Sequence, residues 1–499
     1  MDMTPARILA TAPFARSLCC GLLLAGMLWC DATFGHNTVS HGRGSRDHAA
    51  PSYNHSIPLS LAASPPDDHP IRQGKLTLSD ERYSGLYSAV IDPEHGHAYF
   101  ATANSINPGW VIKLDITGAM PVEVGAAHAA TGEFNLIGSA IDPSAGFAYF
   151  GTTGSPGQIV KVALGAGSAP PRYVGAATLA SGENSAWGMV MDTRDPDPAR
   201  HVLYVATGTS PGRIVKVMAG ARDALPERIA ALTLEPGENT PRRAIADLAH
   251  GFAYFATMGG SPKVIKIGLT PGQDPPSRAG AVPLDANALH NIGSAVIDVP
   301  AGYAYFGTYD VAADRLPAKV YKVALGDGAA PPRKVGEVAL GPADRELSTA
   351  VIDPEHGYAY FGSDHTYPAK VFQIALGPGS APPVLAGVLQ LEGGTQPNPP
   401  DGRNVSNRPE TAYGEVFLQS SVIDPTRGAA YFGTDSHRGQ VVKVALAGGG
   451  GTAVPTQVPR QTSTATSPGT ATPAATLAPT LVATPIWGRL NMPWVVRFH

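Results

Sequence analysis

Cysteine is nearly absent from this chain of 499 residues. Cys19, Cys20 and Cys30 are its three cysteines, and all of them lie close to the N-terminus. If that segment is removed, the rest of the chain can form no disulfide and no thiolate metal site. Charge is also scarce, since charged residues make up 15% of the chain and the formal net charge is −4. No Arg-rich block or basic amphipathic stretch occurs, so we expect no nucleic-acid partner and no membrane-surface helix.

Long hydrophobic runs are missing apart from residues 17–29, an apolar core of about thirteen residues that is too short to span a bilayer comfortably. Arg7 and Arg16 lie before this region and give it a positively charged start, and small residues follow it. The pattern is typical of a secretory signal peptide over residues 1–35, with cleavage near Ala32 or Gly35. We therefore predict an exported protein, secreted or attached to the cell surface, without a transmembrane span in the mature chain. A lipoprotein anchor at Cys30 is the weaker alternative, because the bulky Trp29 occupies the place of a small residue.

Turn-forming residues are abundant, with 57 Gly and 47 Pro. They separate short apolar runs rich in Val, Ile, Tyr and Phe, which are the residues that strands favour. No window keeps a period of 3.6 residues, so the sequence predicts many short strands and very little helix.

One phrase recurs along the chain, as in SAVIDPEHGHAYFAT from Ser88 and TAVIDPEHGYAYFGS from Thr349. A diverged copy, GMVMDTRDPDPARHVLYVAT, begins at Gly188. Each copy contains one marker aspartate, and the seven are Asp92, Asp142, Asp192, Asp247, Asp298, Asp353 and Asp424. A fixed repeat of about fifty residues indicates an array of identical structural units.

Each copy contains four strand-like runs, and four short strands per repeat are the signature of a β-propeller blade. The sequence thus predicts an all-β, seven-bladed propeller over residues 70–447. The last copy stops after its third run, at Leu446, whereas residues 70–78 match the fourth run of residues 171–179 in a P-x-x-x-G-x-x-x-L frame. We expect residues 70–78 to complete the last blade and to close the ring, because an unclosed array would expose open strand edges.

The repeated motif resembles that of the YVTN-type and related bacterial surface propellers, and more narrowly a group of secreted proteins that repeat "AVIDPxxGYAYFGT…PGxVVKVxL". The resemblance covers roughly residues 70 to 447. It implies the fold and a bacterial, exported setting, but it implies no common biochemical activity. The tryptophan-docking repeats of quinoproteins, the sialidase Asp-box and the kelch double glycine are all missing.

The flanks differ from the repeats in composition. Residues 36–69 contain five histidines among Gly, Ser and Asp, and we interpret them as a disordered polar leader rather than a metal-capturing tract. Residues 448–484 are mostly Thr, Pro and Ala, which predicts an extended stalk. Residues 485–499 form an aromatic tail, for which a sorting signal and a segment that docks on the propeller both remain open.

Several residues recur so regularly that a structural role is the simpler interpretation. An aspartate before Pro-x-x-Gly accepts backbone N–H groups in a tight turn, and seven blades need seven such turns. A lysine recurs in the third strand, with Gln373 in its place in the sixth copy, and we expect its stem to pack between blades with its ammonium paired. A tyrosine column should also pack between blades. These positions are Lys113, Lys161, Lys216, Lys266, Lys322 and Lys443, with Tyr99, Tyr149, Tyr204, Tyr254, Tyr305, Tyr360 and Tyr431.

Function is expected where the copies differ, since binding sites usually lie in long loops on a rigid scaffold. Irregular loops occur in blades 5 to 7, together with an insert over residues 393–417 that precedes the last blade. The candidate ligand-binding residues in these loops are Asp310, Asp314, Arg315, Asp364, His365, Tyr367, Arg403, Arg408, Glu415, Asp435, His437 and Arg438.

No catalytic motif or cofactor signature accompanies these residues, so the sequence predicts no catalytic residue, no cofactor and no metal. We do not expect a metal site of His365 and His437 with Asp364 and Asp435, because no fixed spacing supports it. The favoured hypothesis is a monomeric binding module for a glycan, a protein or an envelope component. The alternatives are a lactonase-like or lyase-like enzyme and a purely structural envelope protein. The enzyme is disfavoured because the innermost strands consist mainly of Ser, Ala, Val and Ile.

Overall fold

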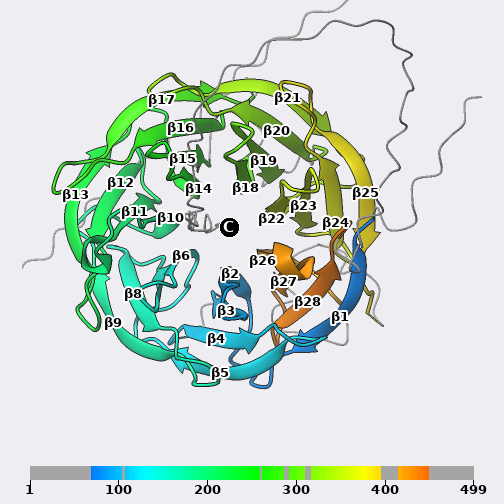
Figure 1. Ribbon diagram of the computed structural model, residues 1–499, viewed down its shortest axis with the longest axis horizontal. Helices are drawn as coiled ribbons and strands as arrows, with labels where there is room; N and C mark the ends of the chain where they lie inside the picture. The colour runs from blue at the N-terminus through cyan, green and yellow to red at the C-terminus, as the bar shows by residue number, and fades with distance from the viewer. Residues whose placement is uncertain are drawn as a thin grey trace, which may run out of the picture. The chain divides into compact units, whose positions relative to one another are not determined.

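The computed structural model describes residues 69–103, 107–258, 261–285, 291–309, 316–394 and 414–448. These residues form seven four-stranded antiparallel sheets arranged as the blades of one propeller (Figure 1). Apart from the strands, the described segments contain two 3-10 helices, η1 (Pro198–Arg200) and η2 (Pro425–Arg427). None of their helices is long and apolar enough to cross a membrane. The predicted all-β propeller of seven blades is confirmed.

Six blades are built from consecutive strands. Blade 1 comprises β2 (Leu86–Asp92), β3 (His97–Thr102), β4 (Trp110–Asp115) and β5 (Val122–His128). Blade 2 comprises β6 (Gly138–Asp142), β7 (Phe147–Gly151), β8 (Gln158–Ala163) and β9 (Arg172–Thr178). Blade 3 comprises β10 (Ala186–Asp192), β11 (Val202–Thr207), β12 (Arg213–Met218) and β13 (Glu227–Thr233).

Blade 4 comprises β14 (Pro241–Asp247), β15 (Phe252–Thr257), β16 (Lys263–Gly268) and β17 (Ser277–Pro283). Blade 5 comprises β18 (Asn291–Asp298), β19 (Tyr303–Tyr309), β20 (Lys319–Ala324) and β21 (Arg333–Ala339). Blade 6 comprises β22 (Leu347–Asp353), β23 (Tyr358–Ser363), β24 (Lys370–Ala375) and β25 (Val384–Gln390). The first strand of every blade lies innermost, nearest the axis of the ring (Figure 1).

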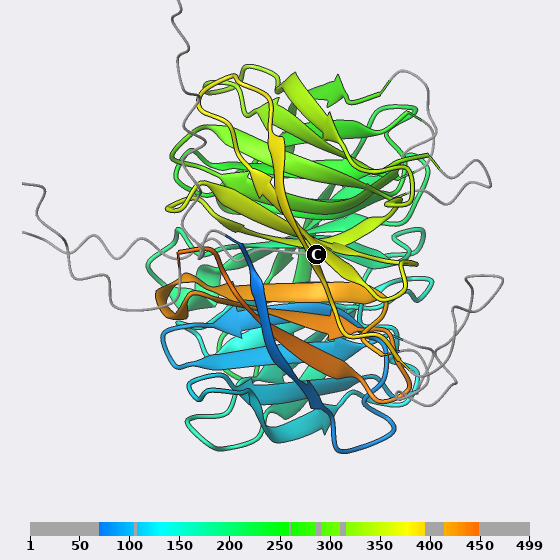
Figure 2. The same ribbon diagram turned by 90° about the vertical axis from the view of Figure 1, so that its right-hand side faces the viewer.

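Blade 7 joins the two ends of the repeat array. It combines β26 (Leu418–Asp424), β27 (Ala429–Thr434) and β28 (Gln440–Ala445) with β1 (Ile71–Thr77), which pairs with β28 as the outermost strand (Figure 2). The side chain of Arg72 on β1 binds Glu415, whose carboxylate is fully buried, with Nη2 2.5 Å from Oε1. The predicted closure by the N-terminal strand is therefore confirmed.

The same ion pair occurs in two ordinary blades, which shows that β1 takes the place of the missing fourth strand of blade 7. Arg228 on β13 binds Glu183, and Arg278 on β17 binds Glu238, each with 2.6 Å between Nη2 and Oε1. In each case the glutamate precedes a blade and the arginine lies on that blade's fourth strand. The N-terminal strand thus reproduces a contact that other blades make within consecutive sequence.

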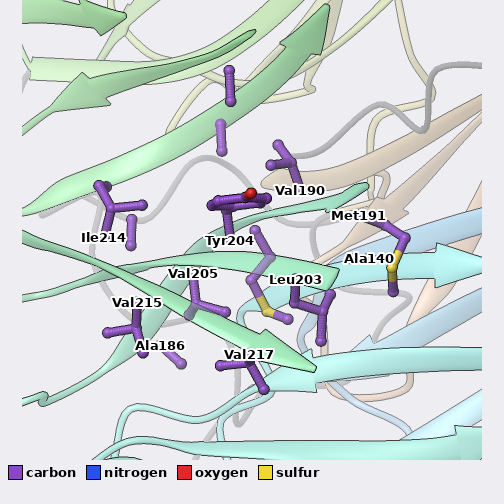
Figure 3. Packing of buried hydrophobic residues seen from close by; sticks show 14 of the residues in the cluster. Ala140, Ala186, Val190, Met191, Leu203, Tyr204, Val205, Ile214, Val215 and Val217 are labelled. Carbon is purple, nitrogen blue, oxygen red and sulfur yellow. The ribbon is translucent and has the colours of Figure 1, made fainter. Parts of the chain in front are cut away.

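The hydrophobic core lies between the blades rather than at the centre of the ring. Around blade 3, Leu203, Val205 and Val215 are fully buried together with Val190 of the innermost strand (Figure 3). Both surfaces of each sheet are covered by neighbouring blades, which explains why the strands are apolar on both sides instead of alternating with polar residues.

We call one side of the ring the turn face. It carries the marker-aspartate turns between strands one and two and the loops between strands three and four. Every marker aspartate accepts a backbone N–H from its turn, as when Asp142 accepts from Ala145 and Asp424 from Arg427. The other five bonds are made by Asp92, Asp192, Asp247, Asp298 and Asp353. The structural interpretation of these aspartates is confirmed.

The repeated lysines tie each blade to the next on the turn face. Lys266 on β16 donates from Nζ to the carbonyl oxygens of Leu325, Gly326, Gly328 and Ala330, at 2.6 to 3.2 Å. These carbonyls belong to the loop between strands three and four of the following blade. Lys113, Lys161, Lys216, Lys322 and Lys443 make equivalent bonds. The predicted pairing of the lysines is confirmed, with carbonyls as the partners.

Gln373 breaks this pattern for a reason that the topology supplies. It lies in blade 6, so the loop that would receive a lysine ammonium belongs to blade 7. Blade 7 has no such loop, because the chain leaves β28 at Ala445 and its fourth strand enters from the N-terminus. Gln373 lies instead beside His69, with 3.4 Å between Oε1 and Nδ1. A neutral side chain replaces a cation where the carbonyl cradle is missing.

Candidate functional site

We call the opposite side of the ring the variable face. It carries the loops between strands two and three and the connections from each blade to the next. The innermost strands approach this face through β-bulges, at which the register slips by a residue. Examples lie between Leu86 and Ser88, between Pro241 and Arg243, and between Leu418 and Ser420. Bulges are common at barrel rims and beside active sites, because they re-aim one side chain.

The residue at this inner position differs from blade to blade although the sequence around it repeats. In the seven blades it is Tyr87, Ile137, Trp187, Arg242, Gly293, Ser348 and Gln419. The residue just after the conserved Thr or Ser at the end of strand two also varies. It is Ala103, Thr153, Gly208, Met258, Tyr309, Asp364 and Asp435. Hydrogen bonds between members of the two sets, described below, bring several of them together on the variable face near the axis of the ring, a region that we call the channel mouth.

Asp364 is the centre of the polar contacts at this mouth. It is buried, and its Oδ2 accepts from Gln419 Nε2 at 2.7 Å and from the Tyr309 hydroxyl at 3.3 Å. Its Oδ1 accepts from the backbone N–H of His365 at 2.9 Å. Blades 5, 6 and 7 thereby meet at one carboxylate.

His365 points its Nδ1 towards two carboxylates, at 2.5 Å from Glu346 Oε2 and 3.4 Å from Asp364 Oδ1. Burial acts to lower the pKa of His365, but hydrogen bonds and charges from Asp364 and Glu346 outweigh it and raise the pKa to about 10. The ring of Phe417 meets the imidazole edge-on, with the centroids 5.1 Å apart. The imidazole is therefore held in one orientation.

Asp435 stands beside this group in blade 7. The hydroxyl of Tyr87 in blade 1 donates to its Oδ2 at 2.8 Å. Burial raises the pKa of Asp435 to about 6, and the charge of Asp364 acts in the same direction, whereas the bond from Tyr87 opposes it. A carboxyl group that exchanges its proton near neutral pH thus lies at the channel mouth.

Blades 3 and 4 contribute an aromatic and a cationic part to the mouth. The guanidinium of Arg242 lies over the Trp187 ring, 5.5 Å from its centroid, and Nη1 lies 3.3 Å from Met258 Sδ. The indole lies against Gly208, where a Cβ would come within 3.3 Å of its Cζ2. The small residue at that position therefore makes room for the half-buried tryptophan.

Arg243, the neighbour of Arg242, is 3% exposed and lies below the mouth. Its guanidinium donates to the carbonyl oxygens of Gly293 in blade 5 and Ser348 in blade 6. These two acceptors are bulged residues, whose carbonyls are not fully used by the strand ladder. The other blades have Ser, Gly or Thr at the position of Arg243, so this one large cation joins the innermost strands of three blades.

Shielded polar atoms without hydrogen-bond partners gather on the variable face. Within the described part of the chain they include Trp187 Nε1, Arg242 Nε and Asp435 Oδ1. Trp110, Ser294, Arg345 and Gln440, which also belong to this face, hold further atoms of this kind. Buried polar groups are normally paired, so these atoms are groups with which water or a polar ligand could form hydrogen bonds.

The structure brings together three of the residues singled out by sequence, Asp364, His365 and Asp435. Glu415 lies in the clasp with Arg72, where its carboxylate is occupied. Tyr367 packs edge-on against Phe417, with 5.1 Å between ring centroids. His437 and Arg438 are half-buried in the loop after β27, and the charge of Arg438 acts on Asp80. Asp310, Asp314, Arg315, Arg403 and Arg408 lie outside the described residues, as does most of the 393–417 insert.

Sequence reasoning passed over Tyr87, Trp187, Arg242, Gln419 and Glu346. The innermost strands hold more than Ser, Ala, Val and Ile, because Tyr87, Trp187, Arg242 and Gln419 stand near their starts. Aligning the seven copies on the marker aspartate puts Tyr87, Trp187, Arg242 and Gln419 in one column, five residues before it. That column varies while its neighbours repeat, and this signal was available in the sequence.

No family model and no curated protein matches this sequence. Solved structures do match: the RRP9 WD40 repeats align with a TM-score of 0.50 at 12% identity, covering 75% of this chain and 98% of that one. The periplasmic gluconolactonase PpgL of Pseudomonas aeruginosa aligns with a TM-score of 0.49 at 12% identity, covering 60% and 83%. Sqt1 of Saccharomyces cerevisiae gives 0.46 at 9% identity, covering 75% and 99%. Identities this low show the propeller fold alone.

Proposed function

We propose that the protein is an exported binding module that takes up an oligosaccharide at the channel mouth of its variable face. The observation that carries this proposal is the gathering of the blade-specific residues Tyr87, Trp187, Arg242, Asp364 and Asp435 at that mouth. Export follows the prediction of a signal peptide over residues 1–35, and a place among the YVTN-type surface propellers is part of the same hypothesis.

The chemistry of the mouth suits a ligand with many hydroxyl groups. Carboxylates, a guanidinium and an amide supply planar arrays of acceptors and donors, and Trp187 and Tyr87 supply flat apolar surfaces with a polar edge. Arg242 and Asp364 bring opposite charges to one opening, which favours a neutral polar ligand over a strongly charged one. Small-molecule sites commonly combine aromatic walls with a few convergent polar groups in this way.

The test is binding of the full-length protein to an array of immobilised oligosaccharides. We expect Trp187→Ala to weaken the strongest signal about 5- to 150-fold, because stacking on an aromatic ring contributes on the order of 1 to 3 kcal/mol. Tyr358→Ala is the matched control, since Tyr358 is a half-buried aromatic on the turn face. Equal binding by both variants, or silence of the wild-type protein across the array, would overturn the proposal in favour of a protein partner or a structural role.

A lactonase-like hydrolase is the second candidate, and Asp435 is the observation in its favour. A group with a pKa of about 6 can both accept and donate a proton near neutral pH, as general acid–base catalysis requires. This function predicts hydrolysis of at least one sugar lactone by the wild-type protein and its loss in Asp435→Asn. An inactive wild-type protein across a lactone panel would remove this candidate.

A further inference from the structure

Three donor atoms of two kinds converge at the edge of the channel mouth. They are one carboxylate oxygen each from Glu346 and Asp364 and one ring nitrogen of His365, and all lie within 4.8 Å of one another. Asp364 is buried, Glu346 is half-buried, and His365 is the exposed member through which solvent reaches the group. Two carboxylates and one imidazole nitrogen form a mixed oxygen and nitrogen donor set, which suits divalent ions of the first transition series.

Neighbouring residues hold the donors in place. Gln419 and Tyr309 donate to Oδ2 of Asp364, and the backbone N–H of His365 donates to Oδ1, so both oxygens are held in place. Phe417 meets the imidazole edge-on and fixes the plane of the ring. Metal sites are typically built this way, with outer groups that orient each ligand and set its free atom.

A second observation comes from Asp435, a neighbour on which the charges of Asp364 and His365 act. Asp435 Oδ1 is shielded from solvent and accepts no hydrogen bond from the described residues, although the other oxygen of that carboxylate is bound by Tyr87. A shielded carboxylate oxygen without a donor is costly, so a cation nearby would relieve it.

We propose that Glu346, Asp364 and His365 form a binding site for a divalent transition-metal ion such as Zn²⁺ or Mn²⁺. The ion takes the place of the proton that His365 shares with the two carboxylates. The protein supplies three ligands, so at least one coordination position would be left for an external ligand. The site is independent of the oligosaccharide proposal, because it is tested without any sugar.

The test is a calorimetric titration of the full-length protein with Zn²⁺, repeated with Mn²⁺ and detected by the loss of the free-ion paramagnetic resonance signal. Histidines in the N-terminal segment can add sites, so the quantity compared is the number of ions bound by each variant. We expect Glu346→Gln and His365→Ala each to bind one ion fewer than the wild-type protein. His437→Ala is the matched control, because His437 lies in the corresponding loop of the next blade, and it should bind the full number.

A milder variant separates positioning from ligation. Gln419→Ala removes the amide that orients Asp364 but keeps all three ligands, so it should keep the site with an affinity about 10- to 100-fold lower. Circular dichroism of each variant checks that the propeller is folded. Equal ion numbers and affinities for the wild-type protein, Glu346→Gln and His365→Ala would overturn the proposal and leave the triad as an ion-paired imidazolium.

Discussion

The two faces of the propeller use the same blades in opposite ways. On the turn face every blade repeats one set of contacts, in which an aspartate closes a turn and a lysine, with one explained exception, fills a carbonyl cradle. On the variable face the equivalent positions carry different residues, and shielded polar atoms without partners collect there. The comparison teaches that repetition in this chain marks stability, whereas departure from repetition marks the surface at which we place function.

The largest expected effect comes from breaking the clasp that closes the ring. Arg72→Ala should lower the free energy of unfolding by about 2 to 4 kcal/mol, because the fully buried Glu415 would lose its main cationic partner. Denaturant unfolding measures this loss. Arg228→Ala is the matched variant for an ordinary blade. It should lower the free energy of unfolding by a similar amount, because the buried Glu183 would also lose its cationic partner.

Hydrogen exchange distinguishes the two variants. Only Arg72→Ala should speed hydrogen exchange along β28. The strand β1 covers the edge of β28 and is joined to the ring by a single ladder of hydrogen bonds, so loss of the ion pair would let β1 detach from β28. Protection of β28 that stays at the wild-type level in Arg72→Ala would show that the ion pair does not secure the clasp.

The next effect tests how much the repeated lysines on the turn face stabilise the fold through the carbonyl oxygens of the following blade. Lys266→Met should cost about 2 kcal/mol, since four carbonyl oxygens lose their donor. Gln373→Lys restores the repeat in blade 6, yet it should also destabilise the fold, because blade 7 offers no loop to receive the ammonium. Thermal unfolding measures both, and a more stable Gln373→Lys protein would refute the explanation given for this exception.

A smaller effect concerns pH on the turn face. His201 is buried beside Asp142, with Nδ1 2.5 Å from Oδ2. Burial alone would lower the pKa of His201, but the hydrogen bond and charge of Asp142 outweigh it and raise the pKa above the usual 6.5. A raised pKa contributes stability that is fully present below pH 6.5 and is lost as the pH rises through the folded-state value.

The wild-type protein should therefore lose stability, on the order of 1 kcal/mol, as the pH rises from 6 towards 9. His201→Gln should be less stable at pH 6 and should show a flatter profile over that window. Denaturant unfolding at several pH values tests this, and parallel profiles for the two proteins would contradict it.

The fold was predictable because the same pattern of turns and apolar runs occurs seven times in the sequence. A turn after each marker aspartate, with Pro and Gly in most copies, and apolar runs of similar length determine each blade. The P-x-x-x-G-x-x-x-L frame of residues 70–78 identified the closing strand. The roles of the marker aspartates and the lysines also followed from their regularity. Only the identity of the lysines' partners, carbonyl oxygens of the next blade, could not be predicted from the sequence.

The site was less predictable because its residues come together only when the ring closes. Asp435 meets Tyr87 although 348 positions separate them in the chain, and Gln419 meets Asp364 across a blade boundary. Loop length pointed to blades 5 to 7 and so to Asp364, His365 and Asp435. Trp187 and Arg242 stand at bulges in short, regular segments, where loop length carries no signal.

The most direct test of the contrast between the faces is one substitution made twice in blade 7. Asp424, on the turn face, is fully buried and accepts from Thr426 Oγ1 and the Arg427 backbone, and Asp435 lies 11 residues later on the variable face. Because the folded-state pKa of Asp435 is raised to about 6, its stability contribution is present below the unfolded-state pKa near 3.8 and is lost as the pH rises through 6.

The measurement is the free energy of unfolding of Asp424→Asn and Asp435→Asn at pH 8 without added ligand. We predict changes of opposite sign in the free energy of unfolding. Asp424→Asn should lower it by about 2 kcal/mol, because the turn and the paired Arg427 lose a carboxylate. Asp435→Asn should raise it by roughly 1 to 3 kcal/mol, because the substitution removes a buried charge. A loss of stability in both variants would contradict the account, because Asp435 would then serve the fold as Asp424 does.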